Sequence, residues 1–253
     1  MIDPSTQGLL ASSALSVPLI AIVPAYNEAP AIAQVVQGLL QLRAANGAAL
    51  IQQVIVADNG SNDQTAVLAQ AAGATVVHEA RRGYGYACSA GINAAQPAAH
   101  LLFVDGDHSV LAQETPALLD ALHAGADLVI GQRVRRQSGA MTLPQILGNA
   151  LACYLARLIW RVPMSDLGPF RLIRREALLR IGMEDMTYGW TIEMQLKAYQ
   201  LGLRVVEVPV TVQARVGVSK VSGTVRGVLG AGIGIFSMIG KLWWRQRRAT
   251  PKM

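Results

Sequence analysis

The chain has 253 residues, of which 52% are hydrophobic, enough to bury the core of one α/β domain and to exclude a disordered chain. Its 22 Lys and Arg residues against 16 Asp and Glu give a formal net charge of +6. This charge favours anionic partners such as nucleotide diphosphates, acidic lipid headgroups or nucleic acid, and nucleic acid is the weakest of these because no aromatics interleave the dispersed basic residues.

Residues 1–18 are expected to be a loose lead-in to the first strand. They lack a basic segment and include Asp3 and Pro4, which are untypical of a signal peptide. Cys88 and Cys153 show no metal-ligand spacing and lie in apolar helical stretches, where a free cysteine behaves as a small buried hydrophobe. We therefore expect a reduced protein on the cytoplasmic side.

Short apolar runs alternate with helical stretches through the first half of the chain. This pattern predicts an α/β fold with a Rossmann-like, mostly parallel sheet flanked by helices. The expected strands are Leu19–Val23, Val54–Val56, Thr75–Val77, Leu101–Val104 and Leu128–Ile130. The expected helices are Pro30–Arg43, a helix capped by Asp63 and ending at Ala72, Tyr84–Ala95 and Thr115–His123.

The rhythm changes after Arg136. A long amphipathic helix is predicted at Leu143–Trp160 and a returning strand at Asp166–Arg175. Helices near Ala177 and at Ile192–Leu201 and a strand at Arg204–Val212 are expected to follow.

Polar side chains follow three of the expected strands, at the point where each strand ends. Asn27 and Glu28 follow the first strand, Asp58 and Asn59 the second, and the pair of aspartates in Asp105-Gly106-Asp107 the fourth. Ligands of parallel α/β sheets bind beyond the carboxyl ends of the strands. The three groups are therefore expected to meet in one crevice.

Asp105-Gly106-Asp107 is the sharpest chemical signal. Two carboxylates separated by a residue without a side chain can face one hard cation, and Mg²⁺ or Mn²⁺ would take oxygens from carboxylate and phosphates. Such a metal neutralises charge that develops on a nucleoside diphosphate leaving group. A solvated acidic turn is the alternative.

The other two groups carry weaker signals. Pro24, Tyr26 and Glu28 lie where the first strand meets its helix, whose N-terminus attracts anions; Glu28 could contact a ribose or base edge and Tyr26 could stack. Asp58 or Asn59 could read the polar edge of a base. The alternatives are a helix-capping loop at the first position and a turn with a helix cap at the second.

Several enzyme classes lack their motifs here. No Gly-x-Gly-x-x-Gly follows the first strand, which disfavours a nicotinamide enzyme, and a P-loop is absent. The four histidines are scattered and suggest no Ser-His-Asp arrangement.

Taken in order, Pro24-Ala25-Tyr26-Asn27-Glu28, Asp58-Asn59-Gly60-Ser61-Asn62-Asp63 and Asp105-Gly106-Asp107 resemble family 2 of the inverting glycosyltransferases. Later segments resemble the polyprenyl-phosphate sugar transferases of the dolichyl-phosphate mannose synthase type. These segments are Gly131-Gln132-Arg133, Ser165-Asp166-Leu167-Gly168-Pro169-Phe170-Arg171, Tyr188-Gly189-Trp190 with Glu193, and Arg215 with Ser219-Lys220. The resemblance covers roughly residues 19–223 and implies a sheet of the GT-A type.

The resemblance also implies roles for individual residues. Pro24, Tyr26 and Glu28 would hold the nucleoside, with Asp58 or Asn59 at the base. Asp105, next to Gly106, would touch the ribose or diphosphate, and Asp107 would bind metal with help from Asp105 and Ser109. Arg133, Arg215 and Lys220 would meet the phosphates of donor or acceptor.

Two positions depart from the family pattern. Asn59 stands where many relatives have a second Asp, which leaves the preferred base open. Gly83-Tyr84-Gly85 stands where many have Gly-Lys-Gly, and Arg82 could replace the lost charge.

Inversion at an anomeric carbon needs a base for a hydroxyl acceptor, whereas a phosphate acceptor is already ionised. Asp166 and Glu193 are the candidate catalytic bases. Asp166 could equally orient Arg171 through a salt bridge.

The tail, residues 224–253, is apolar and basic and is expected to form an amphipathic helical extension. Its apolar stretch Gly227–Gly240 has 14 residues, fewer than the ~17–25 that span a bilayer. Trp243, Trp244 and nearby arginines suit a helix at a membrane interface, although Gly227, Gly230, Gly232 and Gly234 weaken the helix prediction and packing on the domain is the alternative.

These observations predict a metal-dependent inverting transfer of a sugar from a UDP- or GDP-sugar, with polyprenyl phosphate as the acceptor that the subgroup implies. Residues 19–136 would form the nucleotide-sugar-binding half and 137–223 the acceptor half of one domain, peripheral on the cytoplasmic face of the membrane. A nucleotidyltransferase and a non-catalytic sugar-nucleotide-binding module are the alternatives. Oligomeric state is not predicted.

Overall fold

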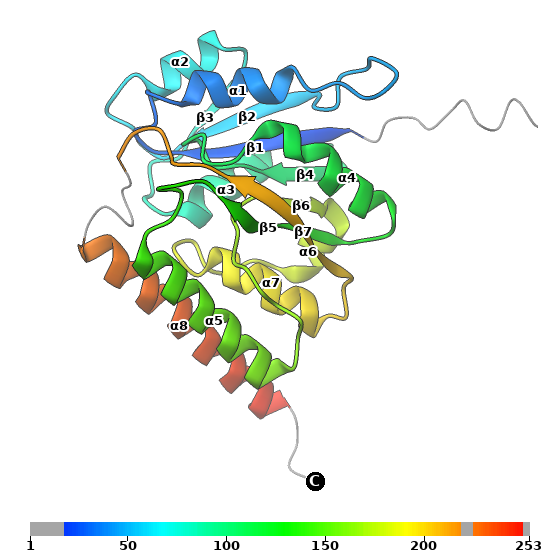
Figure 1. Cartoon of the computed structure of the whole chain (residues 1–253), viewed down its shortest axis with the longest axis vertical. Helices are drawn as coiled ribbons and strands as arrows, with labels where there is room; N and C mark the ends of the chain where they lie inside the picture. Colours follow the sequence, from blue (N-terminus) through cyan, green and yellow to red (C-terminus); the bar gives the residue numbers. More distant parts are fainter. Residues whose placement is uncertain (1–17, 219–224, 250–253) are drawn as a thin grey trace, which may run out of the picture.

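The computed structural model describes residues 18–218 and 225–249, and one mixed sheet lies at its centre (Figure 1). Its seven strands follow the order β3-β2-β1-β4-β6-β5-β7. The strands are β1 (Leu19–Ala25), β2 (Gln53–Asp58), β3 (Thr75–His78), β4 (His100–Phe103), β5 (Leu128–Arg136), β6 (Arg171–Arg174) and β7 (Val205–Val212). The helices are α1 (Ile32–Leu40), α2 (Thr65–Ala71), α3 (Tyr84–Ala94), α4 (Thr115–His123), α5 (Leu143–Trp160), α6 (Arg175–Ile181), α7 (Trp190–Gln200) and α8 (Val225–Ala249), with a 3₁₀ turn at Ala112–Glu114.

The sheet is parallel except at β6, which pairs antiparallel with β4 and with β5. The mostly parallel α/β architecture expected from the sequence is therefore confirmed. The returning strand is shorter than predicted, because only residues 171–174 join the sheet. Asp166 lies outside the strand, where its carboxylate accepts a hydrogen bond from the backbone N–H of Arg133 at 2.8 Å.

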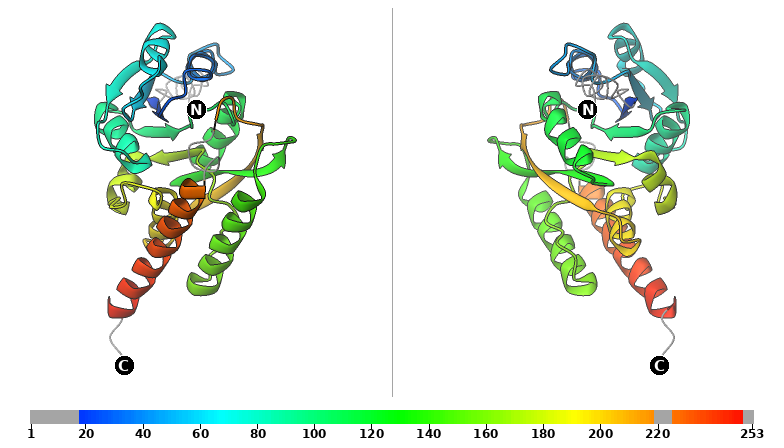
Figure 2. Two further views of the ribbon diagram at one scale, coloured as in Figure 1. Left: turned by 90° about the vertical axis from the view of Figure 1, so that its left-hand side faces the viewer. Right: turned by 90° about the vertical axis from the view of Figure 1, so that its right-hand side faces the viewer.

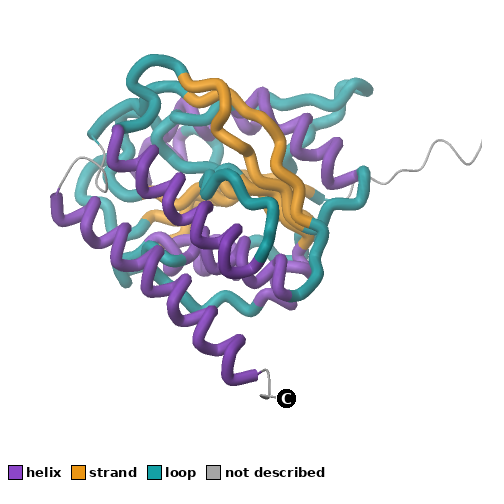
Figure 3. Tube along the Cα trace, turned by 60° about the horizontal axis from the view of Figure 1, so that its bottom comes forward, coloured by secondary structure: helices purple, strands orange, loops and turns teal. Residues whose placement is uncertain are grey.

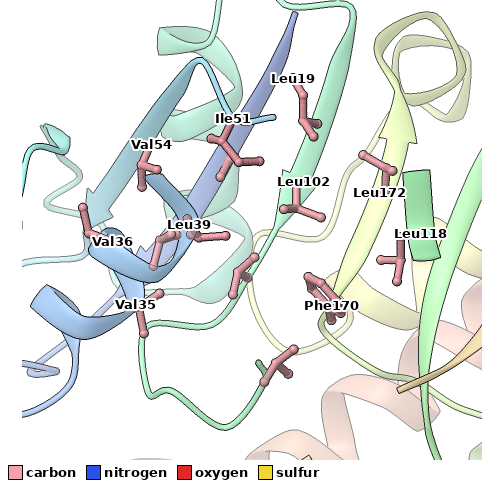
Figure 4. Close-up of a cluster of buried hydrophobic side chains, with 14 of the residues drawn as sticks. Leu19, Val35, Val36, Leu39, Ile51, Val54, Leu102, Leu118, Phe170 and Leu172 are labelled. Carbon is pink, nitrogen blue, oxygen red and sulfur yellow. The ribbon is translucent and has the colours of Figure 1, made fainter. Parts of the chain in front are cut away.

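Alternate residues of the strands supply two separate hydrophobic cores, one on each face of the sheet. One core packs against α1, α2 and α4, and ten of its residues are labelled in Figure 4. The other packs against α3, α6 and α7, with Ile22, Phe103 and Trp190 among its members. Burial of each aliphatic side chain contributes about 1.5–3 kcal/mol to the stability of the fold. The two cores together therefore hold the strands, and with them the strand ends, in place.

Helices α5 and α8 lie side by side and extend beyond the sheet (Figures 2 and 3). Together with α7 they form a third hydrophobic cluster. Cys153 of α5 and Met238, Ile239 and Leu242 of α8 are buried in this cluster. Cys153 and Cys88 are both buried free thiols, as expected.

The C-terminal helix is longer than the sequence suggested. The 14-residue apolar stretch lies inside the 25-residue helix α8, because the helix continues through the glycines and into the Trp- and Arg-rich end. By length and composition, its segment Gly227–Arg248 is long and apolar enough to cross a membrane. The prediction that this region is too short to span was therefore wrong on length.

Candidate active site

The carboxyl ends of β1, β2 and β4 border an open pocket of about 670 Å³. Most of the residues predicted for the donor site line this pocket: Pro24, Tyr26, Glu28, Asn59, Arg82, Asp105, Gly106, Asp107 and Arg215. The strand ends therefore converge as the parallel topology requires. The pocket is also lined by Ala25, Gly83, Tyr84, Ala87, Thr187 and Tyr188.

Two carboxylates, Asp105 and Asp107, face the pocket from the turn after β4. The Tyr84 hydroxyl donates a hydrogen bond to Asp105 Oδ1 at 3.1 Å. Burial, and after it the negative charge of Asp107, raise the pKa of Asp105 to about 7. A cation bound between the two groups would relieve this repulsion, and hard oxygens are the ligands that Mg²⁺ and Mn²⁺ prefer.

The described part of the chain contains no group of three or more His, Cys, Asp or Glu side chains arranged to hold a metal. A divalent cation at the two aspartates would therefore need further oxygen ligands from phosphate or water. This donor set fits a metal that binds together with a diphosphate.

Arg215 brings a positive charge to the same turn. Its guanidinium forms ion pairs with Glu28 Oε1 at 2.6 Å and with Asp107 Oδ2 at 3.4 Å. Backbone hydrogen bonds hold it there, from Val216 N to Asp107 O at 2.9 Å and from Gln213 N to Ser109 O at 3.0 Å. The segment after β7 is thus fastened to the turn after β4.

Ser109 was predicted to help Asp107 bind metal. In the structure its backbone N–H donates to Asp107 Oδ1 at 2.9 Å, and Ser109 does not line the pocket. Its observed contribution is to orient the Asp107 carboxylate.

Tyr26 and Arg82 stack at the pocket. The Arg82 guanidinium carbon lies 3.7 Å from the centre of the Tyr26 ring, a cation–π contact. Arg82 therefore lies next to the ring that was predicted to stack on a base. Arg82 also lines the pocket, and its replacement of the lysine charge of the family pattern remains a prediction.

Asn59 lines the pocket, but its amide is engaged with the neighbouring loop. Its Nδ2 donates to Glu79 O at 3.0 Å and to Arg81 O at 2.6 Å, and its Oδ1 accepts from Gly83 N at 2.9 Å. Asn59 thereby fixes the loop that carries Arg82. A role in reading the base remains a prediction.

Asp58 does not line the pocket. Its side chain is 5% exposed, Oδ2 lies 3.2 Å from His78 Nδ1, and Oδ1 accepts from Ser61 N at 3.2 Å. These contacts match the turn that the sequence offered as the alternative to base recognition.

The loop after β1 is held by the loop after β2. Asn27 adopts the left-handed conformation, with φ of 54°, and its Oδ1 accepts from Asn62 N at 3.0 Å. Asn27 N donates to Ser61 Oγ at 2.9 Å, and Glu28 N donates to Thr65 Oγ1 at 2.8 Å. The two motifs therefore form one unit that presents Glu28 to the pocket.

The predicted candidate base Asp166 forms a bidentate pair with Arg133. Arg133 Nη2 lies 2.6 Å from Asp166 Oδ1, Nε lies 2.9 Å from Oδ2, and neither residue lines the pocket. Burial alone would raise the pKa of Asp166, but the hydrogen bonds and charge of Arg133 outweigh it and lower that pKa. The alternative prediction, a salt bridge between Asp166 and Arg171, was wrong. The Arg171 guanidinium instead donates to the carbonyls of Gly168 and Thr191.

Glu193, the other candidate base, is fully buried in α7 and lies outside the pocket. Its carboxylate accepts backbone N–H groups from Glu184 at 3.1 Å and Asp185 at 2.8 Å and pairs with Lys197 at 2.7 Å. The structure thus gives Glu193 a supporting role for the turn between α6 and α7, and its catalytic role remains a prediction.

Lys220 lies outside the described residues. Tyr84 and Thr187 line the pocket without having been predicted as site residues. The Gly-Tyr-Gly departure from the family pattern marks the position of Tyr84, whereas no motif marks Thr187.

Comparison with protein families places this geometry in context. The sequence model of the family described as glycosyl transferase family 2 matches residues 20–182 of the chain. The chain is 40% identical over 178 residues to an uncharacterized glycosyltransferase of Mycobacterium bovis, covering 69% of this chain and 80% of the relative. It is 31% identical over 219 residues to the polyprenol monophosphomannose synthase of Mycolicibacterium smegmatis, covering 80% of each. It is also 30% identical over 226 residues to the undecaprenyl-phosphate mannosyltransferase of Micrococcus luteus, covering 83% of this chain and 89% of the relative.

Solved structures share the fold. The glucosyl-3-phosphoglycerate synthase of Mycobacterium tuberculosis, crystallised with Mn²⁺, UDP-glucose and phosphoglyceric acid, has a TM-score of 0.72 and 21% identity. The similarity covers 90% of this chain and 80% of that one. A complex of the same enzyme with phosphoglyceric acid has a TM-score of 0.71 and 23% identity, covering 95% and 86% of the two chains.

Proposed function

Because the chain belongs to glycosyl transferase family 2, we propose that it transfers a sugar from a UDP- or GDP-sugar to a polyprenyl phosphate, with inversion at the anomeric carbon. The family predicted from the sequence and the glycosyltransferase activity that it carries are confirmed by the family match and the relatives. The observation that carries the proposal is the Asp105–Asp107 pair facing Arg215 at the carboxyl ends of the strands.

The donor side is proposed to consist of residues 19–136 with Arg215. Asp107 and Asp105 would hold Mg²⁺ or Mn²⁺, which when bound neutralises charge on the departing nucleoside diphosphate. The related fold crystallised with Mn²⁺ and UDP-glucose supports this assignment. Arg215, held between Glu28 and Asp107, would move from these carboxylates toward the phosphates.

The nucleoside is proposed to bind against Pro24, Tyr26 and Glu28. Arg82 already occupies a position over the Tyr26 ring, so a base could share that face with the guanidinium. Lys220 is proposed to assist at the phosphates, as the resemblance implies.

The acceptor side is proposed to comprise residues 137–223 apart from Arg215. The relatives from Mycolicibacterium smegmatis and Micrococcus luteus are named for polyprenol monophosphomannose synthesis and undecaprenyl-phosphate mannosyl transfer, which supports a lipid phosphate acceptor. A phosphate acceptor is ionised at neutral pH and needs no base. This agrees with the engagement of Asp166 by Arg133 and of Glu193 by the turn at 184–185.

The proposed membrane contact uses the outward side of α5. Large apolar side chains at helical spacing are exposed along it: Leu143, Leu147, Leu151, Tyr154 and Leu158. They lie within one arc of the helix, opposite Ala152, Cys153 and Ala156, which are buried against the protein. An apolar stripe of this length on a solvent-facing helix indicates a further partner.

Helix α8 also has an exposed apolar side. Leu229, Ile233, Trp243 and Trp244 are exposed, and Arg247 and Arg248 stack on the two tryptophans at 4.1 Å and 3.6 Å. Tryptophan and arginine together suit the headgroup level of an anionic bilayer. We define these exposed residues of α5 and α8 as the α5/α8 face and propose that it rests on the cytoplasmic surface of the membrane.

An interfacial position of α8 is favoured over a spanning one. Met238, Ile239 and Leu242 are buried against α5 and α7, and the cations of Lys241 and Arg245 pair with Glu184 of the catalytic domain. A helix that crossed the bilayer would have to leave these contacts.

A transfer assay tests the function. Purified protein is incubated with UDP- or GDP-linked glucose or mannose, Mn²⁺ and a polyprenyl phosphate in detergent, and the lipid product and the released nucleoside diphosphate are measured. We expect one donor to give a lipid-linked sugar. Tight nucleotide binding without transfer or donor hydrolysis under any of these combinations would favour a non-catalytic binding module.

A further inference from the structure

The turn between α6 and α7 connects the pocket to the C-terminal helix. Thr187 and Tyr188 line the pocket. Tyr188 also packs against two glycines of α8, Gly230 and Gly234. A residue of the pocket wall therefore lies directly between the pocket and a helix that begins 37 positions later in the chain.

The close approach of α8 depends on the absence of side chains. A Cβ atom at Gly234 would lie 2.8 Å from Tyr188 Cβ, and one at Gly230 would lie 3.2 Å from Tyr188 Cε2. A Cβ atom at Gly232 or Gly240 would meet nothing within 4 Å. Glycine lowers the stability of a helix interior by about 1 kcal/mol relative to alanine, and at positions 230 and 234 it permits the contact with Tyr188.

The backbone on both sides of Tyr188 is held in place. Asp185 Oδ1 accepts from Thr187 N at 2.7 Å and from Gly189 N at 3.0 Å. Met186 O accepts from Tyr86 N at 3.1 Å at the start of α3. A shift of α8 would therefore be taken up by the Tyr188 side chain or by this whole turn.

Charge fastens α8 to the same turn. The Glu184 carboxylate pairs with Arg245 at 2.7 Å and Lys241 at 3.0 Å from α8, and with Lys197 at 3.1 Å from α7. Hydrogen bonds from Arg245, then Lys241, lower the pKa of Glu184. Helix α8 thus meets the turn twice, through glycines at Tyr188 and through cations at Glu184.

We propose that α8 positions Tyr188 as the acceptor-side wall of the pocket, so that the C-terminal helix is part of the active site. This inference rests on the proposed function and adds to it a route by which seating of the α5/α8 face on a membrane sets the pocket. Tyr188 acts on the acceptor, and Gly230 and Gly234 are positioning residues that act through it. Donor binding depends on the two aspartates and Arg215 and is independent of α8.

The test compares Gly234→Ala with Gly232→Ala. Both changes add one methyl group to the same helix and raise its helix propensity equally, but only the first meets Tyr188. For Gly234→Ala we expect the apparent affinity for polyprenyl phosphate and kcat/KM for the acceptor to fall about tenfold or more, since small displacements at a site have large effects on rate. For Gly232→Ala both should stay within about twofold of wild type, as should nucleotide affinity with Mn²⁺ in both variants.

If Gly234→Ala does not fold, two other variants replace it in the test. Gly230→Ala introduces a less severe contact with Tyr188, and Tyr188→Ala removes the tyrosine side chain. Tyr188→Ala should reduce acceptor affinity and kcat/KM while leaving nucleotide affinity unchanged. Equal acceptor kinetics in Gly234→Ala and Gly232→Ala, or an unchanged acceptor affinity in Tyr188→Ala, would overturn the inference while the proposed function stands. A wild-type protein that neither binds nor glycosylates polyprenyl phosphate would overturn the proposed function first and the inference with it.

Discussion

Arg215 Nη2 lies 2.6 Å from Glu28 Oε1 and joins two segments 187 positions apart in the chain. The same guanidinium reaches Asp107 at 3.4 Å. One cation therefore links the loop after β1, the turn after β4 and the segment after β7 around the pocket.

Arg215→Ala should reduce kcat/KM for the sugar donor by at least about 100-fold, because it removes the positive charge proposed to meet the phosphates. Arg135→Ala is the matched control, since Arg135 pairs with Glu114 at 3.3 Å and does not line the pocket. Steady-state kinetics of the two variants measure the effect. Equal activity in both would contradict the role of Arg215.

Asp105 should make stability depend on pH. Its folded pKa of about 7 lies above the ordinary carboxyl value of about 4, so the folded protein binds more protons than the unfolded chain between these values. The free energy of unfolding contributed by this group therefore falls as pH rises from about 4 to about 7. Urea unfolding at several pH values measures this effect. The free energy of unfolding should fall less between about pH 4 and about pH 7 for Asp105→Asn than for wild type.

The same proton should oppose metal binding. Since a metal-bound carboxylate must be ionised, Mn²⁺-dependent nucleotide binding should tighten as pH rises through about 7. Nucleotide affinity that does not change with pH across this range would contradict the assignment of Asp105 to the metal.

Asp166→Ala should lower the free energy of unfolding by about 3 kcal/mol, because it leaves Arg133 without its carboxylate partner. This value is at the lower end of the range for breaking a buried ion pair, since the Arg133 side chain keeps some exposure to solvent. The exposed Asp120→Ala is the control. The pKa of Asp166 is lowered, so its contribution is present above about pH 4 and is lost as pH falls through the folded pKa. A loss of turnover of about 1000-fold without loss of stability would instead mark Asp166 as the catalytic base.

The α5/α8 face should control membrane binding. Leu147→Glu with Leu151→Glu should reduce cosedimentation with vesicles containing phosphatidylglycerol by about tenfold or more, since each buried leucine contributes roughly 1.5–3 kcal/mol. The control is Leu179→Glu, which changes a leucine on α6 outside the face that is as exposed as Leu147. Equal losses in the two proteins, or no loss in either, would contradict the proposal.

The sequence predicts well where local pattern and topology decide the outcome. The helices Thr115–His123 and Leu143–Trp160 match their predicted bounds, each with a proline in its first turn and apolar residues at helical spacing. Strand ends that carry polar residues meet in the pocket because parallel strands share one carboxyl edge.

Partners far apart in the chain could not be read from the same patterns. Asn59 is bound to the backbone of the loop at 79–83, and Asp166 pairs with Arg133 instead of Arg171. The glycines of the tail suggested a weak helix, yet two of them lie where α8 approaches Tyr188. In each case a tertiary contact decides the role of a residue whose local sequence permits several.

The central claim is tested most directly by calorimetric titration of the protein with UDP and with GDP, each with and without Mn²⁺, beside Asp107→Ala. We expect one nucleotide to bind in a metal-dependent manner to the wild type and at least about 100-fold more weakly to a normally folded Asp107→Ala protein. Binding of neither nucleotide by the well-folded wild type, or equal metal-dependent binding by the variant, would contradict a metal-assisted sugar-nucleotide site at Asp105 and Asp107.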